Sequence, residues 1–254
     1  MIENQKVEGG ARMDLTGKTV VVTGAGRGFG RAFALQAGQR GARVFLSART
    51  QAGARKVAEE VAADSGARVD AFACDLADPA TVRGFAEGVA AHTDRVDVLV
   101  NNGARYLAGP DLWDADDEAI SDTVASGATG TLLVVKHFLP LLRASAGADV
   151  VNLVSAAAEA RNHRSQAHPA FYAAKAAQAG FADVLSHRLR PEGIRVISLY
   201  PPDFTDGDPL GPGWERDSRT ADDPLTARSV LDCVLFAIGQ PRDCFIRSFH
   251  FEQV

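Results

Sequence analysis

The chain has 254 residues, 46% of them hydrophobic, and carries a formal net charge of −5. This composition is typical of a globular protein, and the negative charge argues against nucleic acid as a partner. Its three cysteines form no CxxC pair, which indicates a reducing, cytoplasmic location, and no stretch approaches the ~20 apolar residues that a membrane span needs.

Apolar, β-branched runs alternate with helical patterns along the chain. The predicted strands are residues 18–23, 43–47, 68–73, 96–100, 149–154, 194–199 and 244–249. The predicted helices are residues 27–39, 51–63, a segment opened by Pro79, 116–142, 169–189 and 226–238, and a Pro/Gly/Asp-rich loop covers residues 201–220. Such alternation predicts an α/β fold, a Rossmann-like doubly wound parallel sheet with helices on both faces. We expect a single domain over residues 15–254, behind a flexible N-terminal tail of residues 1–14.

The first predicted strand ends in a glycine-rich turn that opens the first predicted helix. Glycines permit a tight turn and let the backbone approach a pyrophosphate, while the helix offers unpaired N–H groups and the positive end of its dipole. Ligands of parallel α/β sheets bind beyond the carboxyl ends of the strands, where this turn lies. We therefore expect a dinucleotide phosphate to contact Gly24, Gly26, Arg27, Gly28, Phe29 and Gly30.

The spacing of Gly24, Gly28 and Gly30, TGxxxGxG, resembles the cofactor fingerprint of the short-chain dehydrogenases/reductases. The resemblance continues to about residue 202, with an Asp-Leu pair like the family's adenine-contacting pair and a variant of its NNAG motif. A Pro-Pro pair stands where the family has the Pro-Gly that lines the nicotinamide pocket. The resemblance thus implies further cofactor-binding residues: Asp75, Leu76, Asn101, Gly103, Ala104, Pro201, Pro202 and Phe204.

The end of the second predicted strand indicates which dinucleotide binds. NAD sites place an acidic residue there for the ribose 2′-OH, whereas this chain has Ala48 followed by Arg49 and Thr50. Arg27 lies in the phosphate turn, and two guanidiniums can hold a 2′-phosphate through charge-assisted hydrogen bonds. The sequence therefore predicts NADP(H) as the cofactor, with Arg49 and Thr50 among the residues that bind it.

The resemblance also implies a catalytic centre. The family uses a tyrosine as acid/base, a lysine four residues later that binds the nicotinamide ribose, and a serine that holds the substrate oxygen. A phenol has an ordinary pKa of ~10, and a nearby ammonium lowers it toward neutrality. Ser155 and Lys175 match the family pattern, but the position four residues before the lysine is Phe171, and Tyr172 comes one residue later.

Three explanations of the missing phenol stay open from the sequence. Tyr172 takes over after a local distortion of the helix that Pro169 opens; Phe171 is a replacement of tyrosine that disables the enzyme; or the natural protein lacks the usual acid. In the third case another group or water replaces the phenol, or the protein transfers no hydride. His163 and His168 are candidate proton donors, although such histidines are more often solvated.

A second departure concerns the long central helix. The family keeps an asparagine there, three residues before a glycine, for a proton-relay water, and this chain has Gly127 in its place. Ser126 is a possible replacement, but a helical serine is more often on the surface or bonded back to a carbonyl. The histidines lack ligand spacing, so the sequence predicts no metal site.

These features predict an NADP(H)-dependent oxidoreductase that interconverts a carbonyl and a secondary alcohol on a small to medium organic substrate. Two alternatives stay open: a catalytically impaired NADP-binding family member, and a redox-neutral isomerase or lyase on the same fold. The family commonly assembles through the helices that correspond to residues 116–142 and 169–189, so we expect a homodimer or homotetramer. Residues 201–220 are expected to cover the substrate or to form a solvated acidic loop.

Overall fold

The computed structural model of the protein describes residues 13–109, 111–214 and 219–252. Within these residues a seven-stranded parallel sheet has the strand order β3-β2-β1-β4-β5-β6-β7. Its strands are β1 (Thr19–Val22), β2 (Arg43–Ala48), β3 (Val69–Ala73), β4 (Val98–Asn101), β5 (Asp149–Leu153), β6 (Arg195–Tyr200) and β7 (Ser248–His250).

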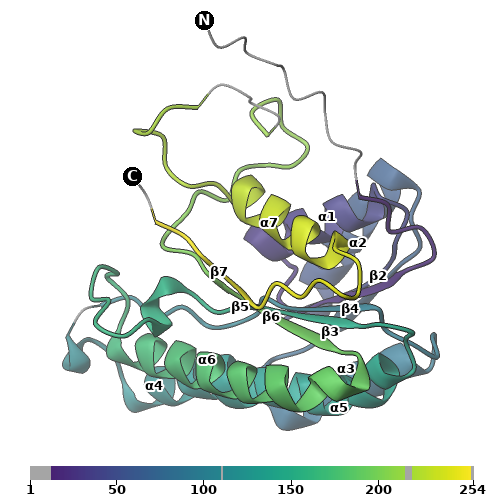
Figure 1. Ribbon diagram of the computed structural model, residues 1–254. Coiled ribbons are helices and arrows are strands. Elements are labelled where there is room, and N and C mark those ends of the chain that lie inside the picture. Colours follow the sequence, from purple (N-terminus) through teal and green to yellow (C-terminus); the bar gives the residue numbers. More distant parts are fainter. Residues whose placement is uncertain (1–12, 110, 215–218, 253–254) are drawn as a thin grey trace, which may run out of the picture.

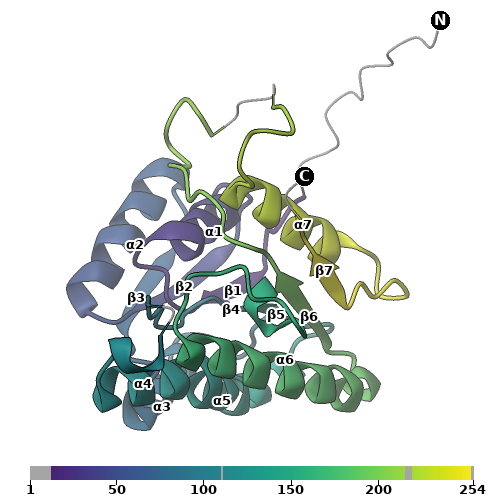
Figure 2. The same ribbon diagram turned by 90° about the vertical axis from the view of Figure 1, so that its left-hand side faces the viewer.

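Helices cover both faces of the sheet, as Figures 1 and 2 show. One face carries α1 (Gly28–Gly38), α2 (Gln51–Ser65) and α7 (Ala227–Gly239). The other carries α3 (Pro79–Ala90), α4 (Asp117–Val124), α5 (Thr131–Arg143) and α6 (Pro169–Leu189). The predicted doubly wound, Rossmann-like fold is confirmed, and the chain reverses its direction of winding between β1 and β4.

Alternate residues of each strand enter two separate hydrophobic layers. Val20 and Val22 of β1 join the layer under α1, α2 and α7, whereas Val21 joins the layer under α3, α5 and α6. In β2, Leu46 joins the layer under α1, α2 and α7, and Phe45 joins the layer under α3, α5 and α6. Because side chains alternate across a strand and helices cover both faces, these strands are continuous apolar runs in the sequence.

The segment predicted as one helix over residues 116–142 is α4 and α5 joined by a π-helical turn, Ala125–Gly130. Two close approaches accompany this turn. A Cβ on Gly130 would lie 2.1 Å from the Leu76 carbonyl oxygen, and one on Gly127 would lie 2.9 Å from the Cβ of Ala174 in α6. The glycines therefore let the turn touch its neighbours, and single π-turns of this kind are frequent at functional sites.

The combined segment Asp117–Arg143 is long and apolar enough to cross a membrane by length and composition alone. In the structure it packs on the sheet, where Val134, Val135, Phe138 and Leu142 lie in the buried layer. The core helix of a folded domain passes the same test, so this feature is weak evidence for a membrane span.

The end of the sheet is shorter than the sequence predicts. The last strand, β7, is Ser248–His250, so it shares only residues 248 and 249 with the expected strand over residues 244–249. The residues before β7 instead form a loop around the buried guanidinium of Arg195, which pairs with Asp149 at 2.7 and 2.9 Å and donates to the Cys244 carbonyl at 2.8 Å. A carbonyl turned toward this guanidinium is not available to a strand ladder, which accounts for the shorter strand.

Most of the tail predicted over residues 1–14 lies outside the described residues, which begin at Met13. Met13 is half-buried and packs against α7, since a Cβ on Gly239 would lie 3.1 Å from its sulfur. Asp14 accepts hydrogen bonds from the amide and the hydroxyl of Thr16. The folded part of the chain thus includes Met13 and Asp14.

Two helical glycines give a matched test of the close approach at the π-turn. Gly130→Ala should lower the free energy of unfolding by about 1–3 kcal/mol, because its methyl group would overlap the Leu76 carbonyl. Gly180→Ala should instead raise it by about 0.5–1 kcal/mol, because α6 leaves open space at that position and alanine favours helix. Urea unfolding of both variants measures these changes, and an equal effect of the two substitutions would contradict the packing argument.

Candidate active site

The crevice between β1 and β4 is fixed by a contact between two backbones. A Cβ on Gly24, whose φ is +63°, would lie 2.5 Å from the Cα of Gly103. The Thr23 hydroxyl accepts hydrogen bonds from the amides of Asn102 at 3.1 Å and Gly103 at 3.2 Å. The Asn102 side chain donates to the carbonyls of Thr23 and Gly24 at 3.1 and 3.0 Å. These bonds hold the turn after β1 against the turn after β4.

Helix α1 begins directly behind this turn, and no side chain caps its amino terminus. Arg27 is the N-cap residue without a side-chain capping bond, and the first turn of the helix holds no acidic residue. Gly28 has a φ of +55°, a conformation that glycine adopts readily. The glycine cradle and the uncapped helix terminus therefore fit a dinucleotide phosphate, which such a terminus attracts.

The residues expected to select NADP lie at the rim of this cradle. A Cβ on Gly26 would lie 3.1 Å from the Cβ of Ala48, so position 48 faces the turn. Arg27 and Arg49 are exposed, and neither guanidinium has a hydrogen-bond or ion-pair partner among the described residues. Thr50 serves a structural purpose here, because its hydroxyl caps α2 by accepting from the Gly53 amide at 3.1 Å.

The remaining residues expected near the adenine have partners within the protein. The Asp75 carboxylate pairs with Arg105 at 2.8 Å. Leu76 packs against the turn after β4, and the buried Asn101 donates from its amide to Asn152 at 2.9 Å. These contacts place the three residues at the predicted edge of the sheet, while their roles toward a cofactor stay predictions.

The loop after β6 lies against α1 through alternate residues. The ring of Phe204 meets that of Phe29 at 6.1 Å, the Asp206 carboxylate lies 2.9–3.1 Å from where a Cβ on Gly28 would be, and Asp208 pairs with Arg31 at 3.0 Å. Phe29 is buried, so its ring packs in the core and is not open to a ligand. The loop thus holds two carboxylates at the phosphate turn.

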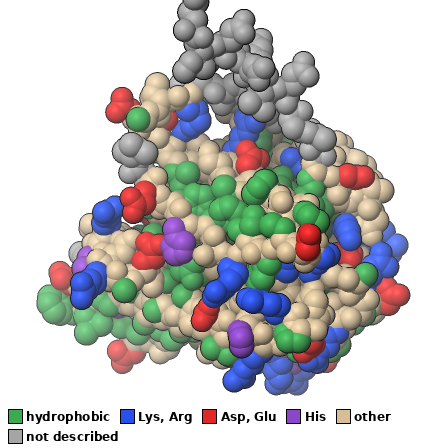
Figure 3. Space-filling view, viewed as in Figure 1, with side chains coloured by type: hydrophobic (Ala, Val, Ile, Leu, Met, Phe, Trp, Pro, Cys, Tyr) green, Lys and Arg blue, Asp and Glu red, His purple; other side chains and the backbone are tan. Residues whose placement is uncertain are grey.

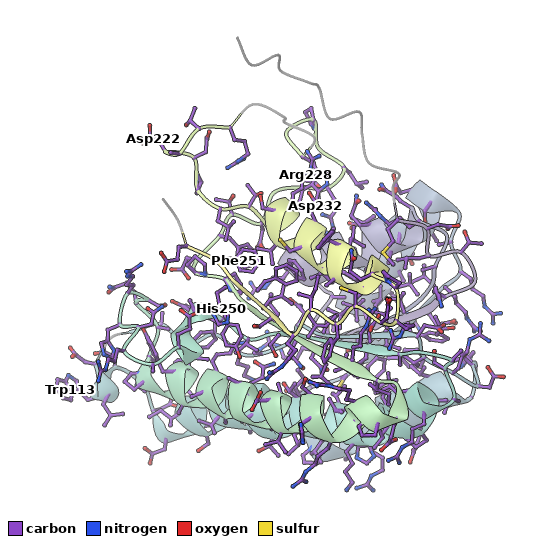
Figure 4. All side chains as sticks on the ribbon, in the orientation of Figure 1. Trp113, Asp222, Arg228, Asp232, His250 and Phe251 are labelled. Carbon is purple, nitrogen blue, oxygen red and sulfur yellow. The ribbon has the colours of Figure 1, made fainter. Side chains whose placement is uncertain are left out.

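A cleft of about 500 Å³ separates the far side of this loop from α7. Asp206 and the buried Trp214 line it from the loop, and Arg228 and Asp232 line it from the helix. Figure 4 shows the last two residues along the exposed side of α7, beneath the loop that carries Asp222. The loop after β6 therefore borders the phosphate turn on one side and an open cleft on the other.

Ser155 follows β5 in a strained backbone conformation. Its φ of 123° lies in the region that favours glycine. The Ser155 amide donates to the Leu199 carbonyl at 3.2 Å, and the Ala156 amide donates to the Pro201 carbonyl at 2.9 Å. The serine is thus held between the ends of β5 and β6, and strain maintained in this way is typical of functional sites. Its hydroxyl accepts a hydrogen bond from the Ala157 amide at 3.1 Å.

Lys175 is buried on α6 and bonds to the last residue of β5. Its ammonium donates to the Leu153 carbonyl at 2.7 Å and to the Gln178 side chain at 3.1 Å. Burial lowers the pKa of Lys175 from its ordinary value of 10.5 to about 7. The ring of Phe171 lies 5.5 Å from the ammonium. That this ring stands where the family has its phenol stays a prediction.

Tyr172 is engaged by the loop before α6. Its hydroxyl donates to the Ser165 carbonyl at 3.1 Å and accepts from the Ser165 amide at 3.2 Å. The structure records no contact between the Tyr172 hydroxyl and Lys175 within the described residues. The role of Tyr172 as the acid stays a prediction, and these two bonds argue against it.

Comparison with known proteins assigns the chain to a family. Residues 18–207 match the short chain dehydrogenase family. The chain belongs to the short-chain dehydrogenase/reductase family. D-threitol dehydrogenase of Mycolicibacterium smegmatis is 33% identical over 190 residues, which cover 74% of this chain and 70% of that protein. Retinol dehydrogenase 13 of Mus musculus is 32% identical over 209 residues, and the match spans 77% of this chain and 62% of that protein.

Solved structures give the same assignment. A metagenomic short-chain oxidoreductase in complex with NADP aligns with a TM-score of 0.76 and 28% identity, over 93% of this chain and 96% of that one. L-sorbose reductase from Gluconobacter frateurii aligns with a TM-score of 0.81 over 96% of this chain and 98% of that one. At 20% identity the second likeness shows the fold alone. The family relationship supports an enzyme of the oxidoreductase class.

The expected replacement for the family's asparagine, Ser126, has its hydroxyl already bonded to the backbone. Ser126 accepts a hydrogen bond from the Arg105 amide at 3.0 Å and donates to the Thr123 carbonyl at 3.2 Å. Gly127 lies against α6 and within 3.9 Å of Ala104, measured from a Cβ built on the glycine, so an asparagine would not fit here without a shift.

The two histidines proposed as proton donors differ in surroundings. His163 is exposed. His168 is fully buried as the N-cap of α6, where its Nδ1 accepts from the Ala170 amide and its Nε2 lies 3.1 Å from the Leu112 carbonyl. Both ring nitrogens of His168 are thus occupied, and the histidine fixes the start of the helix.

Two residues near the site escaped the sequence analysis. Tyr106 meets the ring of Phe171 edge to face at 5.2 Å, and Asp206 lies at the phosphate turn. The available signal for Tyr106 was its place two residues after the Asn-Asn-Gly-Ala motif, at the carboxyl end of β4. No such signal exists for Asp206, because a contact between the loop after β6 and α1 depends on the fold.

The Asp206 carboxylate should oppose cofactor binding. Replacement by asparagine removes one negative charge from the place where phosphates approach α1, and ~1 kcal/mol for charges ~4 Å apart in water corresponds to about five-fold tighter NADPH binding. Asp203→Asn is the matched control, since this exposed residue of the same loop makes no hydrogen bond or ion pair with α1 among the described residues. Fluorescence titration measures both dissociation constants, and unchanged or weaker binding by Asp206→Asn would contradict the expectation.

Lys175 should make the stability of the cofactor-free protein depend on pH. Its pKa is about 7 in the folded protein but 10.5 ordinarily, so between these values the unfolded chain binds one more proton. The free energy of unfolding should therefore rise as the pH increases from about 7 toward 10. Below pH 7 it is lowered by the full cost of burying the charged Lys175 ammonium. Lys175→Met should lack this rise when urea midpoints are compared at pH 6.5 and 9.5, whereas parallel profiles would refute the lowered pKa.

Proposed function

We propose that this protein is an NADP(H)-dependent oxidoreductase that interconverts a carbonyl and a secondary alcohol. The observation that carries the proposal is that the phosphate cradle, the strained Ser155 and the buried Lys175 lie along one edge of the sheet. The cradle follows β1, the serine follows β5, and Lys175 bonds to the carbonyl of the last residue of β5. Binding beyond the carboxyl ends of the strands is the rule for this fold.

The cofactor fits the residues around the crevice. Gly24, Gly28 and Gly30 supply the cradle for its phosphates, and Lys175 supplies a buried ammonium for the nicotinamide ribose. When bound, the nicotinamide would supply a hydride to a carbonyl carbon. Ser155 would orient the carbonyl oxygen through its hydroxyl, which sits at a fixed position because the ends of β5 and β6 hold its backbone.

The preference for NADP(H) over NAD(H) rests on the rim of the cradle. Ala48 provides no carboxylate for a ribose 2′-OH, and its side chain lies at Gly26. Arg27 and Arg49 are exposed guanidiniums that can pair with a 2′-phosphate. The metagenomic relative in complex with NADP is consistent with this preference.

The substrate proposed is a small to medium organic ketone or alcohol. The connection from β4 to α4 exposes three large apolar side chains, those of Tyr106, Leu112 and Trp113. Trp113 is 81% exposed and points outward at the edge of the molecule in Figure 4. Exposed apolar side chains of this kind favour organic groups, and the named relatives are dehydrogenases of D-threitol and retinol.

We also propose a cytoplasmic homodimer or homotetramer that binds neither nucleic acid nor membrane. Leu132 of α5 and Val184 of α6 are 43% and 46% exposed on helices through which the family commonly assembles. Figure 3 shows hydrophobic side chains gathered over α7 and β7, and Phe236 of α7 is 59% exposed. Apolar surface of this kind is suited to contacts between subunits.

The experiment that tests the activity follows NADPH oxidation at 340 nm with acetophenone, cyclohexanone and dihydroxyacetone. We expect turnover with at least one of these ketones. NADPH binding without turnover across a wider ketone panel would overturn the oxidoreductase proposal.

The same preparation tests cofactor choice. Arg49→Ala should narrow the difference in binding free energy between NADPH and NADH by about 1–3 kcal/mol, the contribution of a charged hydrogen bond. Arg55→Ala, an exposed arginine on α2 away from the cradle, serves as the control. Equal affinities of the unaltered protein for the two dinucleotides would contradict the argument.

A further inference from the structure

We propose that Tyr106 supplies the proton at this site, in place of the phenol that position 171 lacks. The inference rests on the proposed function, because it names the acid of that same reaction. It starts from the contact between the rings of Tyr106 and Phe171, which meet edge to face with centroids 5.2 Å apart.

The other acids near Phe171 are already occupied. The Tyr172 hydroxyl makes two hydrogen bonds to the backbone of Ser165. His168 is fully buried, with both ring nitrogens against backbone groups. The Tyr106 side chain, by contrast, is 53% exposed, and its hydroxyl makes no hydrogen bond within the described part of the chain. Of these three groups, only the Tyr106 phenol is available to a ligand.

Phe171 connects Tyr106 to the rest of the catalytic residues. Its ring lies 5.5 Å from the Lys175 ammonium and contacts the Tyr106 ring, so one phenyl group separates the lysine from the phenol. Tyr106 comes from the carboxyl end of β4, next to the Asn-Asn-Gly-Ala turn that packs on Gly24. Ser155 follows β5, the strand next to β4, so Ser155 and Tyr106 come from neighbouring strand ends at the same edge of the sheet.

The backbone before Tyr106 is fixed on two sides. The Arg105 amide donates to the Ser126 hydroxyl at 3.0 Å, within the π-helical turn. The Arg105 guanidinium pairs with Asp75 at 2.8 Å and also with Asp122. These bonds tie Arg105 to the turn after β3 and to α4, so the phenol extends from an anchored position although the ring itself is half exposed.

The proton transfer balances without a relay through the protein. As the carbonyl carbon accepts a hydride, the carbonyl oxygen gains the electron pair of the C=O π bond and takes the proton of the Tyr106 hydroxyl. An alcohol and a phenolate result, and solvent water returns a proton to the exposed phenolate. Gly127 is consistent with this route, because a phenol in contact with solvent does not need the family's relay asparagine.

The test compares three tyrosine-to-phenylalanine variants, since the chain has three tyrosines. Tyr106→Phe should lower kcat for the reduced ketone by roughly 10²–10⁴-fold, the scale of a positioned acid, with the NADPH dissociation constant unchanged. Tyr200→Phe, on β6 and stacked on His250, should leave kcat within two-fold. Adding Phe171→Tyr to the Tyr106→Phe variant should restore turnover, which a merely structural loss would not allow.

A readout independent of turnover uses protein labelled with 3-fluorotyrosine. Of its three ¹⁹F resonances, assigned from the variants, the one of Tyr106 should shift when NADP⁺ and the alcohol product are added together. The inference is overturned if Tyr106→Phe retains full activity, if Tyr172→Phe alone abolishes it, or if the Tyr106 resonance does not move. Full activity in Tyr106→Phe would overturn the role of Tyr106 but not the proposed oxidoreductase function. Absence of turnover in the unaltered protein would overturn both proposals.

Discussion

At the carboxyl ends of β1 and β4 two backbone segments lie so close together that Gly24 and Gly103 have no room for a side chain. The hydroxyl of Thr23 and the amide of Asn102 join the two turns across this contact. Because helices leave the sheet toward opposite faces here, a crevice opens beside the contact. The phosphate cradle follows β1 and the segment that carries Tyr106 follows β4. These few hydrogen bonds therefore fix the positions of both.

The catalytic side depends on a second anchor, the ends of β5 and β6. Ser155 keeps a φ of 123° because the carbonyls of both Leu199 and Pro201 hold the backbone around it. Lys175 is bound to the end of the same β5 and lies under the ring of Phe171. With phenylalanine at position 171 these two residues are still held at the end of β5, and under our proposal the hydroxyl of Tyr106 supplies the proton.

Charge at the crevice is divided between the elements that meet there. Arg27 and Arg49 lie at the rim of the cradle, while Asp206 and Asp208 reach it from the loop after β6. The uncapped terminus of α1 attracts either a phosphate or a carboxylate, since both are anions. The loop that borders the open cleft beside α7 thus contacts the phosphate turn through its carboxylates as well as through the packing of Phe204 on Phe29.

The sequence alone determined the alternation of strands and helices, the glycine turn and the places of Ser155 and Lys175, because these follow from local periodicity and motif spacing. It also placed a phenylalanine four residues before Lys175, where the resemblance leads us to expect a tyrosine. Only the tertiary structure decided where Tyr106, Tyr172 and Asp206 lie, since their neighbours are far away in the chain or depend on the rotation of α6. The same reason explains the π-turn at Gly130: a helical pattern in sequence does not record the approach of the Leu76 carbonyl from another strand end.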